Sequence, residues 1–390
     1  MKTNEEISKK TILILSFSNL LKDPRIYRQI SFLNDKYEIV TSGFGKSYHL
    51  NIVNIDIEKP SNKLLFNKIP IALLMCLNCF EKSYWNFPII RNGIKALDQL
   101  NDHSFDLIIA NDLLSLLIAL EKSKQWGARV LLDAHEYTPR QYDDQLINKL
   151  FFPKFWDYIC KKYLSKADGM ITVSPGIADE YNKNYGVNCE VITNTPFYHE
   201  LEPTSVDEKR IKIIHHGVLG ESRGSENMIL LMNHLDDRFC IDFMVVNNKG
   251  KYFKKIKDMA KDNPRIRFID PVPMPLIAEK LNIYDVGLYM LKPSTFNTYM
   301  ALPNKIFEFI QGRLATAIWP SPEMARIVQN YDCGIVSDDF TIQSMAEKLN
   351  ALSVEDIMKF KENAHHAAPV LCAEKNKDIL LNIVKGLIGK

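Results

Sequence analysis

The chain has 390 residues, of which 46% are hydrophobic and 25% charged. This is the composition of a soluble globular protein, and it excludes a disordered chain, a collagen-like repeat and a small disulfide scaffold. The 49 Lys and Arg residues exceed the 47 Asp and Glu residues by only +2. Because a general nucleic-acid binder carries a larger basic excess, we expect no nucleic-acid partner.

The seven cysteines have no regular spacing, which favours a reducing compartment over a disulfide framework. Cys76 and Cys79 form a CxxC motif inside an apolar run, and no second pair follows at the spacing of a zinc site. We therefore expect these two cysteines to pack together in the interior, and we predict no metal site.

The N-terminal segment is charged and leads into TILILSF (residues 11–17), which is too short for the apolar core of a signal peptide. The longest apolar run, residues 69–80, has 12 residues, whereas a membrane-spanning helix needs about 20. The sequence therefore predicts a cytoplasmic protein and leaves open a peripheral contact with the inner face of the cell membrane.

Short apolar runs alternate with amphipathic segments along the whole chain, which is typical of parallel sheets covered by helices on both faces. We predict strands at residues 12–17, 37–41, 107–110, 128–132, 169–172 and 189–192, and then at 211–215, 241–246, 266–269, 286–290, 315–318 and 334–336. The polar segment 196–210 between the two sets contains two prolines and is predicted to be a linker. The chain is thus expected to form two consecutive α/β domains.

In such folds ligands bind beyond the carboxyl ends of the strands, so the residues that follow strands are the first candidates. The first strand is followed by neither a dinucleotide fingerprint nor a P-loop, which argues against a dehydrogenase or a kinase. Asp23 and Pro24 are predicted to start a helix. Arg25 and Arg28 on that helix are candidate acceptor-binding residues.

Two later segments of the first half also place polar groups after strands. His135 lies between two carboxylates in DAHE (residues 133–136), and a neighbouring carboxylate can orient a histidine or raise its pKa. Ser174 is predicted to cap the helix that begins at Pro175, and it is a further acceptor-binding candidate.

The second half contains the segments best suited to bind a nucleoside diphosphate. Gly217 and Gly220 form a loop after a strand and Arg223 follows, an arrangement that suits a phosphate group. In LPNKIFEFIQG (residues 302–312), Asn304 is expected to cap a helix that carries Lys305 and Glu308 on one face. The lysine would neutralise phosphates and the glutamate would bind ribose hydroxyls.

Taken in order, these segments resemble retaining glycosyltransferases of family 4, which have the GT-B fold. The resemblance rests on DPRIYRQ (residues 23–29), DAHEY (133–137), VSPGIADEY (173–181), HHGVLGESRG (215–224), YDVGLYML (284–291) and LPNKIFEFIQG (302–312). It implies two Rossmann-like domains that face each other across a central cleft. They are an acceptor-binding domain over residues 1–200 and a donor-binding domain over residues 201–372, followed by a C-terminal helix (373–390) that crosses back to the first domain.

The resemblance also implies roles. Arg223 and Lys305 would stabilise the departing diphosphate, His135 would lie near the transferred sugar, and Gly217, Gly220, Asn304 and Glu308 would complete the donor site. The nucleotide sugar, UDP- or GDP-linked, is a substrate, and no cofactor or metal is required. Such enzymes retain the configuration of the sugar and transfer hexosyl or N-acetylhexosaminyl groups to a glycan or lipid-linked acceptor, here in bacterial surface polysaccharide synthesis.

The sequence departs from the family pattern at one position. Many members carry a pair of glutamates in this segment, the first of which touches sugar hydroxyls; Glu308 matches the second, and Met300 stands at the first. Sugar recognition is then expected from Asn297, Thr298 or the backbone amides of residues 299–302. Two alternatives stay open, a sugar-nucleotide epimerase of the same fold and a non-catalytic subunit that stabilises a partner transferase.

Two segments mix aromatic residues with lysines, residues 63–91 and residues 150–162. In transferases that use lipid-linked acceptors, such segments dock on the anionic membrane surface. Internal packing of the aromatic side chains is an equally good interpretation.

Overall fold

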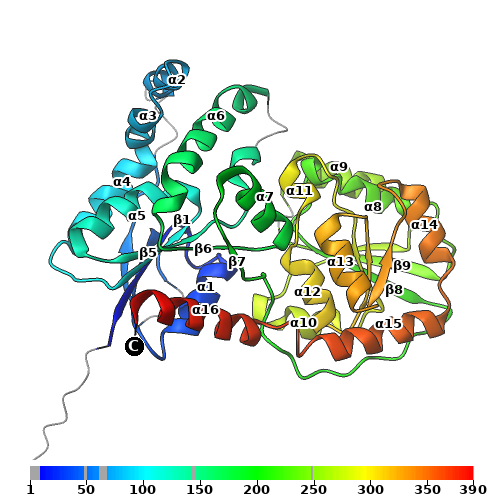
Figure 1. Cartoon of the computed structure of the whole chain (residues 1–390). Helices are drawn as coiled ribbons and strands as arrows, with labels where there is room; N and C mark the ends of the chain where they lie inside the picture. Colours follow the sequence, from blue (N-terminus) through cyan, green and yellow to red (C-terminus); the bar gives the residue numbers. More distant parts are fainter. Residues whose placement is uncertain (1–8, 48–50, 61–67, 142–145, 247–248, 390) are drawn as a thin grey trace, which may run out of the picture. The chain divides into compact units, whose positions relative to one another are not determined.

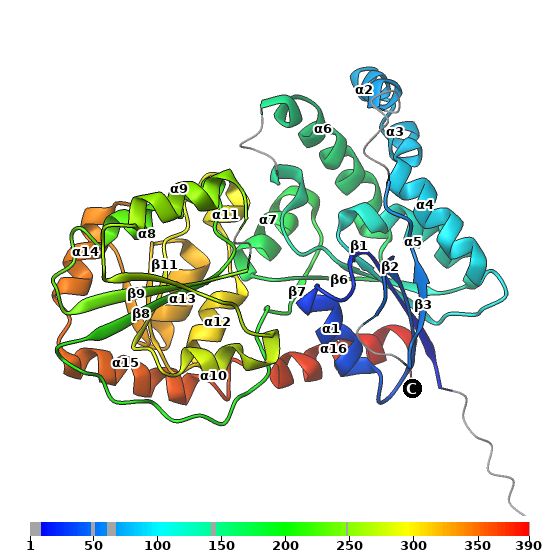
Figure 2. The ribbon, with the colours of Figure 1, turned by 180° about the vertical axis from the view of Figure 1, so that it is seen from behind.

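A computed structural model describes residues 9–47, 51–60, 68–141, 146–246 and 249–389 (Figure 1). The chain divides into two compact units. Unit 1 comprises Met1–Ile192 together with Lys377–Lys390, and unit 2 comprises Thr193–Asn376. Within each unit helices cover both faces of a central sheet, as the views from the front and from behind show (Figure 2).

The described part of unit 1 contains a seven-stranded sheet in the order β3-β2-β1-β4-β5-β6-β7. Its neighbouring strands are all parallel. The strands are β1 (Thr11–Asn19), β2 (Glu38–Phe44), β3 (Val53–Asp56), β4 (Leu107–Asn111), β5 (Arg129–Asp133), β6 (Gly169–Thr172) and β7 (Glu190–Val191). The central strands are apolar at nearly every position because helices cover both of their faces, and Ile12, Leu13, Ile14 and Leu15 are fully buried.

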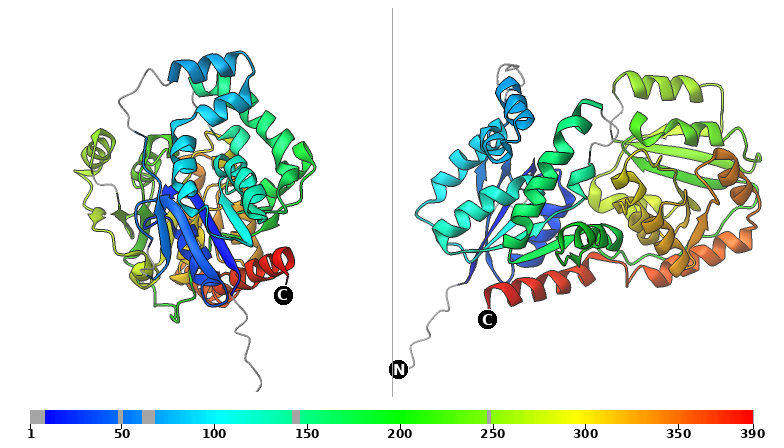
Figure 3. Two further views of the ribbon diagram at one scale, coloured as in Figure 1. Left: turned by 90° about the vertical axis from the view of Figure 1, so that its left-hand side faces the viewer. Right: turned by 45° about the horizontal axis from the view of Figure 1, so that its top comes forward.

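The helices of unit 1 are α1 (Pro24–Leu33), α2 (Lys68–Cys76), α3 (Phe80–Asn86), α4 (Pro88–Leu97), α5 (Leu113–Trp126), α6 (Leu146–Tyr163) and α7 (Pro175–Tyr185). Helices α2, α3 and α6 pack against one another and extend beyond the end of the sheet (Figure 3). No helix in the described part of the chain is both long enough and apolar enough to span a membrane.

The described part of unit 2 contains a six-stranded parallel sheet in the order β10-β9-β8-β11-β12-β13. The strands are β8 (Ile211–Gly217), β9 (Phe239–Val245), β10 (Ile266–Ile269), β11 (Val286–Tyr289), β12 (Ala315–Ile318) and β13 (Gly334–Val336). Successive side chains point to opposite faces of a strand. Ile213 of β8 therefore belongs to one buried cluster and Ile214 to the other, so the sheet has a core on each face.

The helices of unit 2 are α8 (Glu226–Leu231), α9 (Lys251–Ala260), α10 (Ile277–Leu281), α11 (Phe296–Tyr299), α12 (Asn304–Gln311), α13 (Pro322–Asn330), α14 (Ile342–Asn350) and α15 (Val354–Ala367). The last helix, α16 (Ala373–Ile388), begins in unit 2 and continues from Lys377 in unit 1. The polar segment at 193–210 contains neither helix nor strand and belongs to unit 2. The fully buried Arg313 holds it by donating to the carbonyls of His199 and Leu201.

The predicted fold class is confirmed, since both units are α/β structures with parallel sheets. Twelve of the strands lie where apolar runs predicted them: β6, β10, β12 and β13 have the predicted ends, and the ends of the others differ by at most three residues. The prediction missed β3, an edge strand with the half-polar sequence VNID that pairs only with β2. An edge strand needs little burial, so it carries no strong apolar signal.

Candidate functional site

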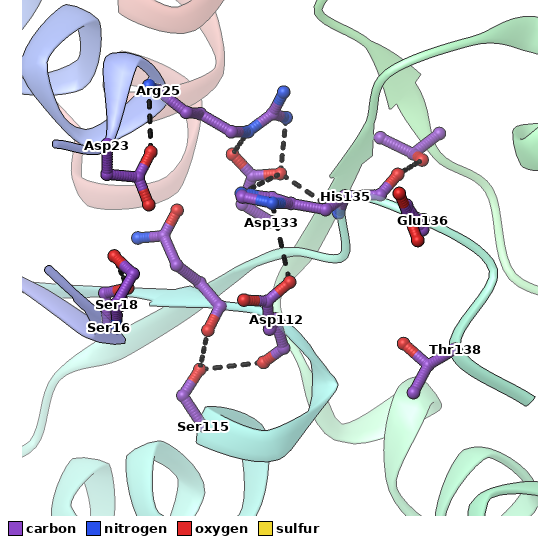
Figure 4. A network of polar contacts seen from close by, with 12 residues as sticks. Ser16, Ser18, Asp23, Arg25, Asp112, Ser115, Asp133, His135, Glu136 and Thr138 are labelled. Carbon is purple, nitrogen blue, oxygen red and sulfur yellow. Dashed lines mark hydrogen bonds and ion pairs between the residues drawn. The ribbon is translucent and has the colours of Figure 1, made fainter. Parts of the chain in front are cut away.

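A polar cluster in unit 1 is built around Asp133, at the carboxyl end of β5 (Figure 4). The Arg25 guanidinium of α1 donates to both carboxylate oxygens of Asp133, and Gln29 Nε2 donates to Oδ2 at 2.7 Å. Gln29 also exchanges hydrogen bonds with Asn111 of β4, at 2.9 and 3.1 Å. All four side chains are buried, with exposed fractions of 6% or less. The charge of Arg25 is therefore neutralised inside the unit.

The start of α1 aims Arg25 at this cluster. The Asp23 carboxylate accepts from the amides of Arg25 and Ile26 at 3.0 and 3.3 Å, and Pro24 occupies the first turn. The predicted helix start is thus confirmed. Arg28, the second arginine predicted on this helix, is also buried.

His135 follows Asp133 at the same end of the sheet and has an unusual backbone. Its φ angle is +55°, and that of Asp112 after β4 is +66°, both in the left-handed region that disfavours residues with a Cβ. The strained backbone brings the two side chains together, with 3.4 Å between His135 Nδ1 and Asp112 Oδ1 (Figure 4). The His135 ring is about a quarter exposed. A carboxylate thus orients an accessible imidazole.

Ser174 stands directly before α7, as predicted, with Pro175 as the first helical residue. Its side chain is fully buried, and its Oγ makes no hydrogen bond to another described residue. The predicted side-chain cap is therefore wrong, although the helix begins where expected. The extended backbone of Ser174 before a proline is sufficient to start this helix.

The second cluster lies in unit 2, where α12 faces the carboxyl end of β8. Lys305 and Glu308 share one face of α12, and each is only 9% exposed. Gly217 ends β8 with φ of +98°, and a Cβ placed there would lie 2.9 Å from Lys305 Nζ. Glu308 Oε2 lies 3.3 Å from His216 Nε2. This burial excludes a solvent-exposed ion pair between Lys305 and Glu308.

The electrostatics of this cluster are dominated by positive charge. Burial, with the nearby charge of Arg223, lowers the pKa of Lys305 to about 8, and Glu308 offsets only part of this shift. Burial and Lys305 also lower the pKa of His215 to about 3 and that of His216 well below its ordinary value. Both imidazoles are therefore neutral at pH 7. Arg223 and Lys305 then face a single carboxylate, and an anionic ligand would balance the excess charge.

The remaining residues predicted for the donor site are Gly220, Arg223 and Asn304. Gly220 precedes a 3-10 turn, Glu221–Arg223, and its amide donates a hydrogen bond to Ser225 Oγ at 3.0 Å. Arg223 is exposed at the end of that turn. The predicted cap at Asn304 is wrong by one residue, because Pro303 occupies the N-cap position and Asn304 is the first residue of the helix. Proline has a fixed φ and no N–H, so it fits that boundary.

The segment expected to recognise the sugar is partly occupied by its own hydrogen bonds. Thr298 and Thr295 form a reciprocal capping box at α11. The amides of Tyr299 and Met300 donate to Thr295 and Phe296 at 3.0 and 2.9 Å. Asn297 is buried. Of the predicted sugar contacts, the Thr298 hydroxyl and these two amides already have partners within the turn.

The expected packing of the two CxxC cysteines is wrong. Cys76 is exposed and Cys79 is half-buried, because α2 ends at Cys76 and the chain turns before α3. Within the described ranges, no group of three or more His, Cys, Asp and Glu side chains is placed to hold a metal ion.

The aromatic-basic segments fall partly outside the described residues, which omit 61–67 and 142–145. Where they are described, Phe80, Phe155 and Trp156 are buried, and the rings of Phe155 and Trp156 pack at 4.7 Å. Leu73 and Leu77 of the α2 region are 59% and 63% exposed. These segments thus contain both internal packing and exposed apolar surface.

Sequence reasoning missed three residues of these clusters: Asp112 beside His135, His216 beside Glu308, and Tyr289 beneath Lys305. Each stands at or directly after the carboxyl end of a strand, β4, β8 and β11. A location at the carboxyl end of a predicted strand could therefore have identified all three residues as candidates. Their partners, however, belong to other elements and could not be read from local sequence.

Residues 69–195 match the family model described as Glycosyltransferase Family 4. This segment lies almost entirely in unit 1. A search of curated protein sequences finds no significant match.

Solved structures extend the likeness to the whole chain. Sucrose-phosphate synthase from Thermosynechococcus elongatus has a TM-score of 0.73 at 11% identity, over 97% of this chain and 99% of that one. HepE of Anabaena in complex with UDP-glucose has a TM-score of 0.69 at 12% identity, over 96% and 99%. WaaG, a glycosyltransferase involved in lipopolysaccharide biosynthesis, has a TM-score of 0.64 at 12% identity, over 94% and 99%. The GT-B fold and the resemblance to glycosyltransferase family 4 are thereby confirmed.

Proposed function

We propose that the protein is a retaining glycosyltransferase that moves a hexosyl or N-acetylhexosaminyl group from a nucleoside diphosphate to an acceptor. The observation that carries the proposal is the cationic cluster of unit 2, which contains the buried Lys305 and the exposed Arg223. Two cations face one carboxylate there, Lys305 is held on α12 beside Gly217, and the neighbouring histidines are neutral. A diphosphate has the charge to fill such a cluster.

In this proposal each residue acts on a defined part of the substrates. Lys305 and Arg223 bind the diphosphate and stabilise the negative charge that grows on it as the sugar departs. Glu308 accepts hydrogen bonds from the ribose hydroxyls. His135 contacts the transferred sugar, and Asp112 orients its ring. The leaving diphosphate helps to accept the proton of the acceptor hydroxyl, which gives transfer on one face with retention.

We assign Arg25 a role in positioning the site instead of direct acceptor binding. Its guanidinium is buried and bound to both oxygens of Asp133, whose backbone leads into His135. We propose that Arg25 fixes the loop that presents His135, and that the buried Arg28 and Ser174 support the acceptor side from within unit 1. The acceptor is a glycan or lipid-linked glycan of bacterial surface polysaccharide synthesis. The likeness to WaaG supports this pathway.

The first test is nucleotide binding measured by thermal shift with UDP, GDP, CMP and their sugar conjugates, with EDTA present throughout. A ligand that binds only the native state raises its stability by ~2.7 kcal/mol at a hundredfold excess over Kd. We expect a selective shift with UDP or GDP compounds. A product assay with the binding conjugate then distinguishes transfer from epimerisation. A folded protein that binds no nucleotide would instead support the non-catalytic subunit.

His135 separates binding from transfer. We expect His135→Ala to reduce the transfer rate at least tenfold and to change nucleotide affinity less than twofold, because the ring lies in unit 1 and the phosphate cluster in unit 2. Exposed His103 provides the matched control, and His103→Ala should leave both quantities unchanged. Unaltered transfer in His135→Ala would assign His135 a purely structural role.

We also propose a peripheral membrane contact through α2 and α6. Leu73 and Leu77 are exposed apolar residues, and Lys154 and Lys161 add exposed positive charge. Apolar insertion next to basic residues suits an anionic leaflet. The protein should co-sediment with phosphatidylglycerol vesicles at low salt and be released at high salt, and Leu73→Ser with Leu77→Ser should weaken this binding. Absence of binding at low salt would refute the contact.

A further inference from the structure

Tyr289, the last residue of β11, lies directly beneath the cationic cluster of unit 2. Its side chain is 3% exposed, and Lys305 Nζ lies 5.0 Å from the centre of its ring. An ammonium group in this position is attracted by the negative face of the aromatic ring. Gly217 borders the same ammonium, since a Cβ there would come within 2.9 Å of Nζ. The ring and the glycine together restrict where the charge of Lys305 can lie.

The hydroxyl of the same tyrosine interacts with the second cation. A hydrogen bond and the positive charge of Arg223 both act on the Tyr289 phenol, and they partly offset the rise of its pKa that burial causes. The backbone strengthens this link, because the amide of Lys292, three residues after Tyr289, donates to the Arg223 carbonyl at 3.1 Å. Tyr289 thus contacts Lys305 with its ring, and the backbone that follows it is hydrogen-bonded to the turn that carries Arg223.

Neighbouring groups hold the Tyr289 ring without adding charge. The His215 ring stacks on it with 5.9 Å between centroids and 21° between planes. His215 is itself fixed by a contact of 3.1 Å between Nδ1 and the Leu288 carbonyl. Because His215 is neutral at pH 7, the packing beneath Tyr289 changes neither the sign nor the size of the charge above it.

We propose that Tyr289 is a positioning residue that holds Lys305 beside Arg223 while leaving both charges available to a diphosphate. The inference rests on the proposed function of this cluster. An aromatic ring suits the task better than a second carboxylate, because a carboxylate would neutralise a cation and compete with the phosphate oxygens.

The test compares Tyr289→Phe and Tyr289→Leu with the wild-type protein by calorimetric titration of UDP and UMP. Tyr289→Phe keeps the ring and loses only the hydroxyl, so we expect UDP affinity to fall about fivefold. Tyr289→Leu loses both contacts, and we expect a fall of about thirtyfold. UMP lacks the second phosphate and should lose less than threefold in both variants. The graded loss, specific to the diphosphate, distinguishes positioning from general damage.

Tyr284→Phe is the matched control. Tyr284 is a buried tyrosine of the same unit whose hydroxyl donates to Asp242 at 2.7 Å, so this variant also loses a buried hydrogen bond. It should bind UDP as the wild type does. Equal UDP affinity in wild type and Tyr289→Phe, or equal losses for UDP and UMP, would overturn the inference.

If the proposed function itself is wrong, the folded wild-type protein binds neither UDP nor GDP. The positioning role of Tyr289 is then wrong as well. If the wild type binds GDP rather than UDP, the same comparison is made with GDP and GMP and has the same meaning.

Discussion

The two polar clusters differ in how they balance charge. In unit 1 the buried guanidinium of Arg25 is matched by both oxygens of Asp133, and Gln29 adds a further hydrogen bond to that carboxylate. In unit 2 the charge of Arg223 lowers the pKa of Lys305, Glu308 offsets only part of that shift, and the neighbouring histidines are neutral. The first cluster is complete in the sense that its charges balance, whereas the second is incomplete in the sense that its positive charge exceeds its negative charge. This difference supports a structural role for the first cluster and a ligand-binding role for the second.

The largest effect is expected from breaking the complete cluster. Asp133→Ala leaves Arg25 buried without its counter-charge, which should lower the free energy of unfolding of unit 1 by about 3–5 kcal/mol. Urea unfolding followed by tryptophan fluorescence measures this, since Trp85, Trp126 and Trp156 lie in unit 1 and only Trp319 lies in unit 2.

Arg129→Ala provides the control for that experiment. Arg129 begins the same strand, β5, and its ion pair with Asp168, at 2.7 Å, is largely exposed. Its loss should cost less than about 1 kcal/mol. Equal losses of stability in Asp133→Ala and Arg129→Ala would show that the buried Arg25–Asp133 pair stabilises unit 1 no more than an exposed ion pair does.

Breaking the incomplete cluster should change binding rather than folding. Lys305→Ala removes a charged contact to the diphosphate worth about 2–3 kcal/mol, so UDP affinity should fall about a hundredfold, with a parallel loss of turnover. The unfolding free energy should stay the same or rise, because a buried charge next to Arg223 is removed. Glu308→Ala should weaken binding about tenfold through the ribose. Wild-type affinity and turnover in both variants would contradict the assignment of the donor site.

The contrast also explains what local sequence could and could not predict. Continuous apolar runs gave twelve strands, and helical spacing placed Lys305 and Glu308 on one face, because both signals depend on neighbouring residues. The pairing of Arg25 with Asp133 spans 108 residues. It depends on β1 and β5 lying on either side of β4 in one sheet, which no local pattern encodes.

The same limit applies within unit 2. Arg223, Tyr289 and Lys305 come from three different elements, so no local pattern could bring them together in one cluster. The predicted caps at Ser174 and Asn304 failed for a different reason. Proline beside each of them already fixes the backbone at the start of the helix, and the side chain is then not needed.

A change of pH should sharpen the comparison, because the incomplete cluster contains a lysine whose pKa is lowered to about 8. Lys305, with its pKa of about 8, is charged in about nine-tenths of molecules at pH 7 and in about one-tenth at pH 9. Since the diphosphate binds the charged form, UDP affinity should fall about tenfold between these pH values. Lys305→Arg should abolish the pH dependence, because arginine stays charged. A pH-independent wild type would place the Lys305 pKa well above 9.

The smallest effect is expected from a methyl group at the border of the incomplete cluster. Gly217 has φ of +98°, so Gly217→Ala strains the backbone and should cost about 1 kcal/mol of stability. The new Cβ would lie 2.9 Å from Lys305 Nζ, and the flexible lysine can move away at little cost. That movement takes the ammonium off the Tyr289 ring, so UDP affinity should fall several-fold. Gly186→Ala, at φ of +66° in open space in unit 1, should cost similar stability and leave UDP binding unchanged. Equal UDP affinities in the two variants would mean that the position of Lys305 does not govern diphosphate binding.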